Sequence, residues 1–490
     1  MKYISTRGHD KKVAAKEAIL RGLAPDGGLY VPEAIPALDR PLEELLTLPY
    51  IDLAKAILKP YLDFSEAELN ACVEKAYAPG RFTDAKVAPV KSACDVHFLE
   101  LFHGPTLAFK DMALSILPHL MKASASQEEL VILTATSGDT GKAALEAFCD
   151  VENVSIIVFY PQNGVSNLQK RQMITQEGAN TCVIGVEGNF DDAQTGVKMI
   201  FSNTDLARDM AQAGKMFSSA NSINIGRLLP QIVYYFYAYG QLVQKNSIKS
   251  GDAINFVVPT GNFGNILAGY YAKAMGLPIH KLICASNDNK VLYDFLCTGI
   301  YDKNRDFHCT ISPSMDILVS SNLERLLFHV TDAKSVCGMM ESLNTQGRFQ
   351  LDTKLSDFFG VHTSEAETRQ AIFDGSQMGY TMDTHTAVAY HAGRQYVKET
   401  GDDTQQIVIS TASPYKFAED VLRALKVDWD SGDDDSDMAA VQALSTASGL
   451  PIPEAVSQLA NKPVRHTTIC AVKDMEQAVR RRVGAATCRS

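Results

Sequence analysis

The spacing of apolar and polar residues changes about 95 residues into the chain. Before that point the sequence has helical stretches over 11–20, 42–58 and 65–78, and a turn-rich segment, GLAPDGGLYVPEAIP, separates the first two. The Asp-Gly-Gly in this segment is a strong turn signal. The pattern predicts a small N-terminal domain over residues 1–95.

From residue 96 onward, short apolar runs rich in β-forming residues alternate with helical patterns. The predicted strands cover residues 130–136, 153–161, 181–188, 253–259, 281–286 and 405–411. Strands separated by helices predict parallel sheets with right-handed crossovers. We therefore predict an α/β fold with two open parallel-sheet units over residues 96–430. A small α+β extension is expected over residues 431–490.

Composition and charge limit the classes of protein to consider. Of the 490 residues, 46 are Lys or Arg and 57 are Asp or Glu, so the formal net charge is −11. This acidic balance argues against nucleic acid as the main partner. No apolar run approaches the roughly 18 residues that span a membrane, and the N-terminus lacks the apolar core of a signal peptide. We expect a cytoplasmic protein with no membrane partner.

Two further patterns argue against metal sites. The ten cysteines show no C-x-x-C spacing, which is typical of free thiols in a reducing compartment and gives no support for a zinc site. Residues 428–437 hold six Asp, but a calcium loop starting there would need Glu at the position of Ala439. We expect this acidic segment to be a solvated loop.

The motif HGPTLAFKD, residues 103–111, places Lys110 at the start of an apolar helical pattern, DMALSILPHLM. The positive end of a helix disfavours a lysine cation, so this position tends to lower the pKa of its amine. A deprotonated amine is the nucleophile that attacks an aldehyde. Taken alone, the motif is better explained by a surface lysine whose stem covers apolar neighbours, because lysines are common.

The motif TATSGDTGKA, residues 134–143, follows a predicted strand and opens a helix. Its hydroxyls and backbone N–H groups converge, as in an anion site. A nucleotide-binding P-loop is excluded, because Thr136 stands where its first Gly is required and Ala143 stands where Ser or Thr is required. A plain helix cap remains the alternative.

The motif PTGNFGNILAG, residues 259–269, also joins a strand to a helix. Gly261 and Gly264 allow the backbone to approach a ligand closely, and the N–H groups at the helix start suit one phosphate. The spacing G-x-x-G is not the G-x-G-x-x-G of a dinucleotide site, although Asp288 lies where such a site has its acidic residue. A phosphate monoester fits the short loop better.

The motif STASPYKF, residues 410–417, ends a predicted strand with Ser410 and Thr411. Ligands of open α/β sheets bind at such carboxyl ends, and a hydroxyl there can hydrogen-bond a neutral ring nitrogen. Capping of the next helix by Ser413, with Pro414 in its first turn, explains the same residues. His385, in MDTHTAVAY, is expected to be structural.

Together the motifs supply an amine, a cup for one phosphate, a hydroxyl for a ring nitrogen and a second anion loop. Pyridoxal 5'-phosphate has an aldehyde, a phosphate monoester and a pyridine nitrogen, and so would engage the first three. The second anion loop is then available for a substrate carboxylate.

These motifs, with SINIGRLLPQIVYY and the early STRG and GLAPDGGLYVPE, resemble the threonine synthase family over residues 1–430. The resemblance is to its longer microbial and fungal branch, in the tryptophan-synthase-β-like superfamily of fold-type-II enzymes. It implies that Lys110 is the Schiff-base lysine and that Thr411 faces the pyridine nitrogen. It also implies two loops. The cofactor-phosphate loop is formed by Gly261, Asn262, Phe263, Gly264 and Asn265. The substrate-carboxylate loop is formed by Thr136, Ser137, Gly138, Asp139 and Thr140.

The resemblance implies a lyase that converts O-phospho-L-homoserine and water to L-threonine and phosphate, by γ-elimination of phosphate and β-addition of water. Its partner would be this small molecule, and the enzyme would be a monomer or a homodimer. The candidate cations for the substrate phosphate are Lys170, Arg171 and Arg227. A threonine dehydratase, a β-replacement lyase, a nicotinamide-dependent dehydrogenase and a non-catalytic relative remain as alternatives.

Overall fold

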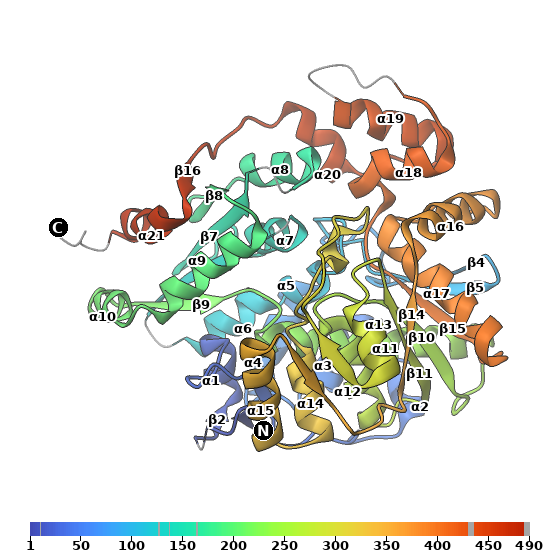
Figure 1. Cartoon of the computed structure of the whole chain (residues 1–490), viewed down its shortest axis with the longest axis horizontal. Helices are drawn as coiled ribbons and strands as arrows, with labels where there is room; N and C mark the ends of the chain where they lie inside the picture. Colours follow the sequence, from blue (N-terminus) through green and yellow to red (C-terminus); the bar gives the residue numbers. More distant parts are fainter. Residues whose placement is uncertain (10, 126–127, 137, 163–164, 430–435, 485–490) are drawn as a thin grey trace.

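The computed structural model describes the whole chain except residues 10, 126–127, 137, 163–164, 430–435 and 485–490. Two β-sheets covered by helices form the centre of the molecule (Figure 1). The larger sheet has the strand order β14-β11-β10-β15-β5-β4, and its pairs are parallel except β4 with β5. Its strands are β4 (Val90–Ala93), β5 (Val96–Glu100), β10 (Ile254–Pro259), β11 (Ile279–Ser286), β14 (Phe358–His362) and β15 (Gln406–Ser410).

The smaller sheet has five strands in the order β16-β8-β7-β6-β9, and all its pairs are parallel. Its strands are β6 (Glu129–Ala135), β7 (Val154–Pro161), β8 (Thr181–Glu187), β9 (Lys215–Ser219) and β16 (Ile469–Ala471). The central strands of both sheets are apolar and buried along their length, as expected for sheets covered on both faces. The predicted α/β class with two parallel-sheet units is thus confirmed. The antiparallel edge strand β4 was not predicted.

Helices of each unit pack on its own sheet. The five-stranded unit carries α7 (Asp139–Phe148), α8 (Asn167–Ile174), α9 (Phe190–Ser202) and α10 (Thr204–Gln212). The six-stranded unit carries α11 (Ile225–Gln244), α12 (Gly264–Met275), α13 (Val291–Thr298), α16 (Glu365–Gln377), α17 (Thr384–Thr400), η2 (Pro414–Phe417) and α18 (Ala418–Leu425). Helix α11 is buried almost all round, which agrees with its almost continuous apolar sequence.

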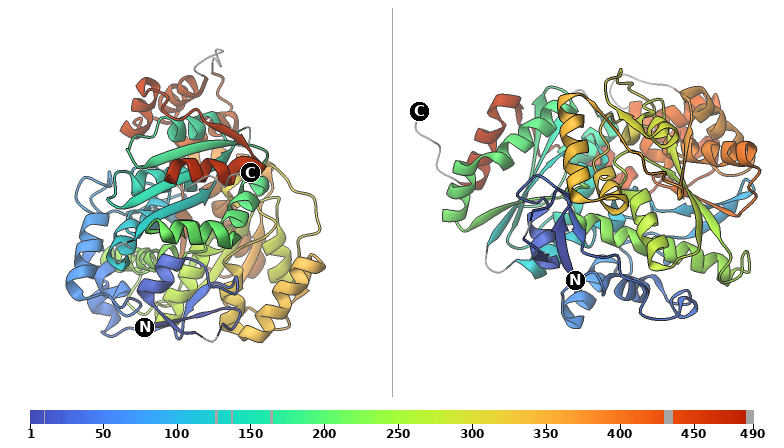
Figure 2. Two further views of the ribbon diagram at one scale, coloured as in Figure 1. Left: turned by 90° about the vertical axis from the view of Figure 1, so that its left-hand side faces the viewer. Right: turned by 60° about the horizontal axis from the view of Figure 1, so that its bottom comes forward.

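The N-terminal part contains a small antiparallel sheet, ordered β2-β1-β3. Its elements are β1 (Lys2–Ser5), β2 (Val13–Ala14), α1 (Ala15–Arg21), β3 (Tyr30–Pro32), α2 (Leu42–Leu45), α3 (Tyr50–Leu58) and α4 (Glu66–Ala76). Figure 2 shows this part lying along one side of the molecule. The fully buried Arg325 donates to the carbonyl oxygens of Tyr30 and Ile223, and so joins the N-terminal part to the core.

The C-terminal extension crosses from one unit to the other (Figure 1). It consists of α19 (Ser436–Ser448), α20 (Glu454–Ser457), η3 (Gln458–Asn461), β16, η4 (Val472–Asp474) and α21 (Met475–Val483). Helix α19 packs on α18 of the six-stranded unit, whereas β16 pairs with β8 and α21 packs on α9 in the five-stranded unit. The extension therefore contacts both units.

Four predicted helices differ in the structure. The stretch over 11–20 contains the short strand β2 and only then becomes α1, and the stretch over 42–58 forms two helices, α2 and α3. Residues 111–121 do not form one helix but two, α5 (Asp111–Leu114) and α6 (Leu117–Ser124). Residues 414–425 begin as the 3₁₀ turn η2, with the predicted Ser413 cap and Pro414 start, and only then become α18. The remaining elements form a segment beside α12: β12 (Ile300–Asp302), η1 (Pro313–Met315), α14 (Leu323–Val330), α15 (Ala333–Thr345) and β13 (Arg348–Gln350).

The described ranges contain nine of the ten cysteines. Within them every cysteine is a free thiol, and His, Cys, Asp and Glu side chains form no cluster that could hold a metal ion. Also within them, no helix is long and apolar enough to cross a lipid bilayer. Most of the acidic segment at 428–437 lies outside the described residues.

Candidate active site

Lys110 lies buried at the start of α5, with a 9% exposed surface. Its Nζ is 3.9 Å from Oδ2 of Asp139 and 4.8 Å from the centre of the Phe109 ring. Burial lowers the pKa of the Lys110 amine to about 8, with Asp139 opposing this and Arg227 adding to it. The sequence argument placed the cause at the helix end, but α5 has only four residues, and loss of solvent is the larger effect.

The loop that carries Lys110 runs beside the loop of the STASPYKF motif. Phe109 N donates to Thr411 O at 2.7 Å, and Ser413 N donates to Leu107 O at 3.0 Å. The two loops meet because β5 and β15 are neighbouring parallel strands and end at the same edge of the sheet. Leu107 adopts a positive φ of 61°, a conformation that non-glycine residues adopt mainly where the surroundings enforce it.

The loop from Gly261 to Asn265 follows β10, the strand on the other side of β15. Its carbonyl oxygens are turned away from its open face: Ser320 Oγ donates to Gly261 O at 2.6 Å, and Asn322 N and Nδ2 donate to Asn262 O. Phe263 has φ 62° and is the N-cap of α12, which begins at Gly264. These contacts fix the loop without using its N–H groups.

The free N–H groups of this loop suit a phosphate. Within the described part of the chain, none of the backbone N–H groups of residues 261–265 has a hydrogen-bond acceptor. A Cβ added at Gly264 would meet Asn322 Nδ2 at 3.6 Å and Gln231 Nε2 at 3.8 Å, which are ordinary van der Waals distances, so a methyl group fits there without a clash. Successive unpaired N–H groups at a helix start form an anion-binding concavity. The residues present therefore fit a phosphate monoester.

The side chain of Asn265 points elsewhere. Its Oδ1 accepts from the hydroxyls of Tyr234 and Tyr235 on α11, at 2.7 and 2.9 Å. Its Nδ2 is buried and has no partner in the described structure. Asn265 thus offers its backbone N–H to the open face of the loop, while its oxygen anchors α12 to α11.

The two hydroxyls at the end of β15 differ in their contacts with the described residues. Ser410 Oγ lies 3.0 Å from Thr386 Oγ1 and 3.4 Å from Tyr380 OH. Thr411 is 4% exposed, and its side chain has no hydrogen bond to any described residue. Thr411, the predicted partner of a ring nitrogen, is therefore the hydroxyl left available.

The predicted carboxylate loop follows β6 of the opposite unit. Thr136 Oγ1 accepts from Gly138 N at 3.0 Å and from Gly141 N at 2.8 Å, so this hydroxyl folds the loop and is turned inward. Thr140 is half-buried at the first turn of α7, and Ser137 lies outside the described residues. Asp139 is buried and faces Lys110 across the gap between the units.

One residue of this site was missed by the sequence argument. Lys416, in the motif's PYKF end, has a fully buried side chain, and its Nζ lies 2.8 Å from Oδ1 of Asp139. Burial alone would raise the pKa of the Asp139 carboxyl, but Lys416 and Lys110 outweigh burial and hold that pKa well below its usual range. The signal in the sequence was a lysine between Tyr415 and Phe417 in an otherwise apolar turn.

The three predicted phosphate cations have different surroundings. Arg227 is 3% exposed, lies near enough to Lys110 to lower its pKa, and has a buried Nε with no partner in the described structure. Arg171 instead donates to the carbonyl oxygens of Leu459 and Ala460 in the C-terminal extension. Lys170 is half-buried on α8. The geometry favours Arg227.

Two other residues singled out in the sequence have structural partners. His385 is buried; its Nδ1 lies 3.0 Å from Asp383 Oδ1, and its Nε2 accepts from Ser314 N at 3.1 Å. This agrees with the structural role expected for it. Asp288, the residue that kept a dinucleotide site open, lies 3.1 Å from His362 Nε2.

Comparison with known proteins agrees with this geometry. Three family models match the chain: "Threonine synthase N terminus" over residues 2–77, "Pyridoxal-phosphate dependent enzyme" over 86–412, and "Threonine synthase, C-terminal" over 386–481. The threonine synthase of Pseudomonas aeruginosa is 40% identical over 442 residues, which cover 86% of this chain and 90% of that protein. The chain belongs to the threonine synthase family.

Other members of the family support the fold and the cofactor class. The crystal structure of a pyridoxal-phosphate-bound threonine synthase from Brucella melitensis superposes with a TM-score of 0.85 at 37% identity, covering 98% of this chain and 99% of that one. Human threonine synthase-like 1 is 41% identical over 456 residues. This chain spans 61% of the length of that relative, and the match covers 87% of this chain. Membership of the pyridoxal-phosphate-dependent enzymes confirms the predicted cofactor, pyridoxal 5'-phosphate.

Proposed function

We propose that this protein is a threonine synthase, a carbon–oxygen lyase that converts O-phospho-L-homoserine and water to L-threonine and phosphate. The observation that carries the proposal is a buried amine of lowered pKa, Lys110, on one of three loops that three adjacent strands deliver to one edge of the sheet. The others carry the free N–H groups of residues 261–265 and the Thr411 hydroxyl. Family membership supports the same assignment.

The cofactor would be held by residues of the six-stranded unit. Its phosphate would accept hydrogen bonds from the backbone N–H groups of Gly261, Asn262, Phe263, Gly264 and Asn265. The Thr411 hydroxyl would face its ring nitrogen, and Lys110 would bind its aldehyde. When bound, pyridoxal 5'-phosphate supplies an aldehyde that reacts with amines and a ring that accepts the electron pair of a broken bond.

The protein's own groups would bind the substrate and move its protons. Lys110, with a pKa of about 8, can give and take a proton near neutral pH once the substrate amine has replaced it. The substrate carboxylate would meet the loop of Thr136, Ser137, Gly138, Asp139 and Thr140 at the start of α7. Arg227, a buried cation beside Lys110, is placed to stabilise the charge of the departing phosphate.

A direct assay tests the proposal. Purified protein incubated with pyridoxal 5'-phosphate and O-phospho-L-homoserine should release phosphate and L-threonine in equal amounts. Borohydride should bleach its yellow absorbance band and leave the label on Lys110. Ammonia and a keto acid formed from L-threonine, without phosphate release from the phosphorylated substrate, would identify a dehydratase instead.

The remaining assignments made from the sequence stand as part of this proposal. We infer a cytoplasmic enzyme that acts as a monomer or homodimer. We also infer an N-terminal domain over 1–95, a catalytic core over 96–430 and an extension over 431–490. The extension contacts both units and so belongs to neither alone, which supports a boundary between the core and the extension. Limited proteolysis and light scattering would test the boundaries and the oligomeric state.

A further inference from the structure

Lys416 is a buried cation at the junction of the two units. It belongs to η2, just after β15 in the six-stranded unit, and its side chain is fully buried. Its Nζ lies 2.8 Å from Asp139 Oδ1, 3.2 Å from Gln172 Oε1 and 3.1 Å from Thr106 O. Asp139 and Gln172 belong to the opposite unit. The three acceptors match the three protons of an ammonium group, so this lysine is held as a cation.

The carboxylate that Lys416 contacts has two distinct sides. Asp139 Oδ1 accepts a hydrogen bond from Lys416 Nζ. It also accepts one from Gln169 Nε2, at 2.9 Å. Asp139 Oδ2 faces Lys110 at 3.9 Å. A buried carboxylate stays charged only when a cation or hydrogen-bond donors compensate the loss of water. Lys416 and Gln169 provide this compensation from the side away from Lys110.

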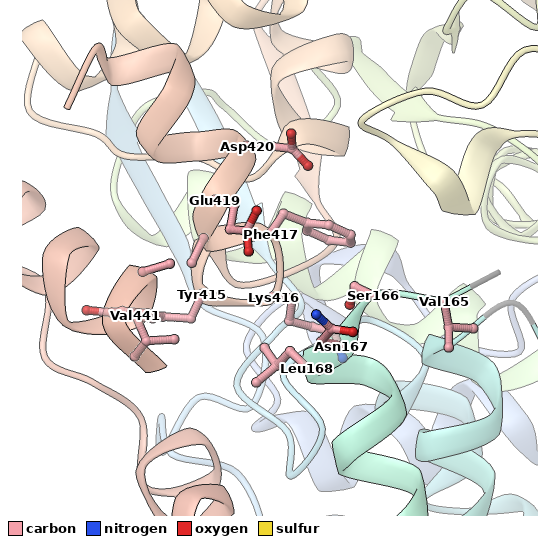
Figure 3. Close-up of a pocket in the computed structure, with 12 residues that line it drawn as sticks. Val165, Ser166, Asn167, Leu168, Tyr415, Lys416, Phe417, Glu419, Asp420 and Val441 are labelled. Atoms are coloured by element: carbon pink, nitrogen blue, oxygen red, sulfur yellow. The ribbon is translucent and has the colours of Figure 1, made fainter. Parts of the chain in front are cut away.

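A pocket lies beside Lys416, at the junction of the two units. Figure 3 shows Lys416 beside Ser166 and Leu168 of the α8 segment, with Tyr415 and Phe417 next to it in the chain. The pocket has a volume of about 290 Å³ and is lined by residues of both units and of α19. Lys416 is one of the lining residues, and its own side chain is fully buried where it contacts Asp139.

A second buried lysine on α7 provides a contrast. Lys142 Nζ lies 2.8 Å from Glu146 and 2.6 Å from Gln176, with both partners in the same unit. Like Lys416 it is a buried lysine paired with a carboxylate and an amide. Its carboxylate partner is not Asp139, so Lys142 serves as the matched control.

We propose that Lys416 is a positioning residue: it is the counter-ion that holds the Asp139 carboxylate directed at Lys110 and offsets part of its charge there. When Lys416 is removed, Gln169 and Lys110 remain to keep Asp139 charged. Asp139 belongs to the five-stranded unit, whereas Lys110 and Lys416 belong to the six-stranded unit. The charge around Lys110 therefore depends on how the two units are docked. The proposal rests on the proposed function only in taking Lys110 as the amine that binds the cofactor aldehyde.

The charged groups around Lys110 determine whether its pKa should rise or fall in each variant. They are Asp139 of α7, Arg227 of α11, Lys416 of η2 and Asp111 of α5; Glu146 of α7 adds to the field at Asp111. Asp139 raises the pKa of Lys110, whereas Lys416 lowers it. Removing Lys416 alone should raise the pKa of Lys110, and removing the Asp139 charge alone should lower it. Removing both charges should leave the pKa of Lys110 nearly unchanged, because the two effects have opposite signs.

The experiment measures how fast the apoprotein binds pyridoxal 5'-phosphate between pH 6 and 10. The rate of formation of the absorbance band gives a pH midpoint for wild type, K416M, D139N, the double variant D139N/K416M, and K142M. We expect the midpoint to rise by about one pH unit in K416M and to fall by about one unit in D139N. It should stay close to wild type in the double variant and in K142M.

Several outcomes would overturn the proposal. Midpoints that do not move, that move in the same direction in both single variants, or that are not restored in the double variant would show that Lys416 does not balance Asp139. A raised KM for the phosphorylated substrate alone, with unchanged midpoints, would make Lys416 a substrate contact instead.

Separate results show whether a variant fails to fold and whether the proposed function itself is wrong. If K416M does not fold, the double variant should still fold, because it leaves no buried carboxylate uncompensated; failure of both would make Lys416 a packing residue and overturn the proposal. The proposed function fails in a different way: wild type would form no band, or the borohydride label would lie on another lysine.

Discussion

The two α/β units build their halves of the site in different ways. In the six-stranded unit, other segments hold the loops: Ser320 and Asn322 bind the carbonyl oxygens of the phosphate loop. The Lys110 and Thr411 loops also pair with each other through Phe109 N. These residues belong to the six-stranded unit and to the segment beside α12, so the proposed cofactor cup is built without the five-stranded unit.

The five-stranded unit contributes a loop that is held mainly from within. Thr136 folds its own loop, and Gln169 of the neighbouring α8 binds Asp139. From outside this unit, Lys416 contacts Asp139 at 2.8 Å and Lys110 faces it at 3.9 Å. The comparison indicates that cofactor binding and substrate binding can be disturbed separately: changes in the first unit should affect the cofactor, and changes in the second should affect the substrate.

Replacing Lys110 should have the largest effect, because this residue serves both halves. Lys110→Ala removes the amine that binds the aldehyde and the group that moves the substrate proton, so turnover should fall by at least about a thousandfold. The yellow band should be lost, and phosphate release from O-phospho-L-homoserine should stop. Retention of wild-type turnover would contradict the assignment.

The two glycines of the phosphate loop should behave differently. A Cβ at Gly264 would meet only side-chain nitrogens at 3.6 and 3.8 Å, so Gly264→Ala should leave the apoprotein's stability unchanged or slightly raised. The methyl group would occupy the space of the phosphate, and affinity for pyridoxal 5'-phosphate should fall by about 10- to 100-fold. Absorbance titration and urea unfolding measure the two effects.

Gly261 provides the matched comparison. Its Cβ would lie 2.6 Å from the backbone oxygen of Ser314, so Gly261→Ala should destabilise the apoprotein itself by about 1–3 kcal/mol. Equal losses of stability in both variants would contradict this steric difference, and an unchanged affinity of Gly264→Ala for pyridoxal 5'-phosphate would show that the phosphate does not bind at Gly264.

The strands of both units and the loops at their carboxyl ends could be predicted from the sequence, because they follow from local patterns. Apolar runs predicted the strands, and strand-to-helix motifs such as GNFGN identified the loops at their carboxyl ends. The role of Lys416 could not be predicted, because its pairing with Asp139 depends on how two units with separate sheets dock. The break of the helix after Lys110 was missed although Pro118, in the first turn of α6, was a local signal for it, because proline lacks the N–H that a continuous helix would need there.

Two hydroxyl residues, one in each unit, would sharpen the comparison. Thr136→Val leaves the N–H groups of Gly138 and Gly141 without their acceptor, which costs about 1–3 kcal/mol. The KM for O-phospho-L-homoserine should rise about tenfold, with little change in cofactor affinity. Ser320→Ala removes a hydrogen bond to Gly261 O and should weaken cofactor binding about fivefold, with KM nearly unchanged. The reverse pattern would contradict the division of roles.

The smallest effect is expected where the C-terminal extension joins the five-stranded unit. Arg171 on α8 donates through Nε to Leu459 O at 2.9 Å and through a terminal nitrogen to Ala460 O at 2.7 Å. Arg171→Ala should lower the free energy of unfolding by about 1–2 kcal/mol and leave cofactor affinity unchanged, because the cup lies in the other unit. Urea unfolding and absorbance titration of the same sample measure both quantities. If instead the KM for the phosphorylated substrate rose at unchanged stability, Arg171 would be the phosphate contact in place of Arg227.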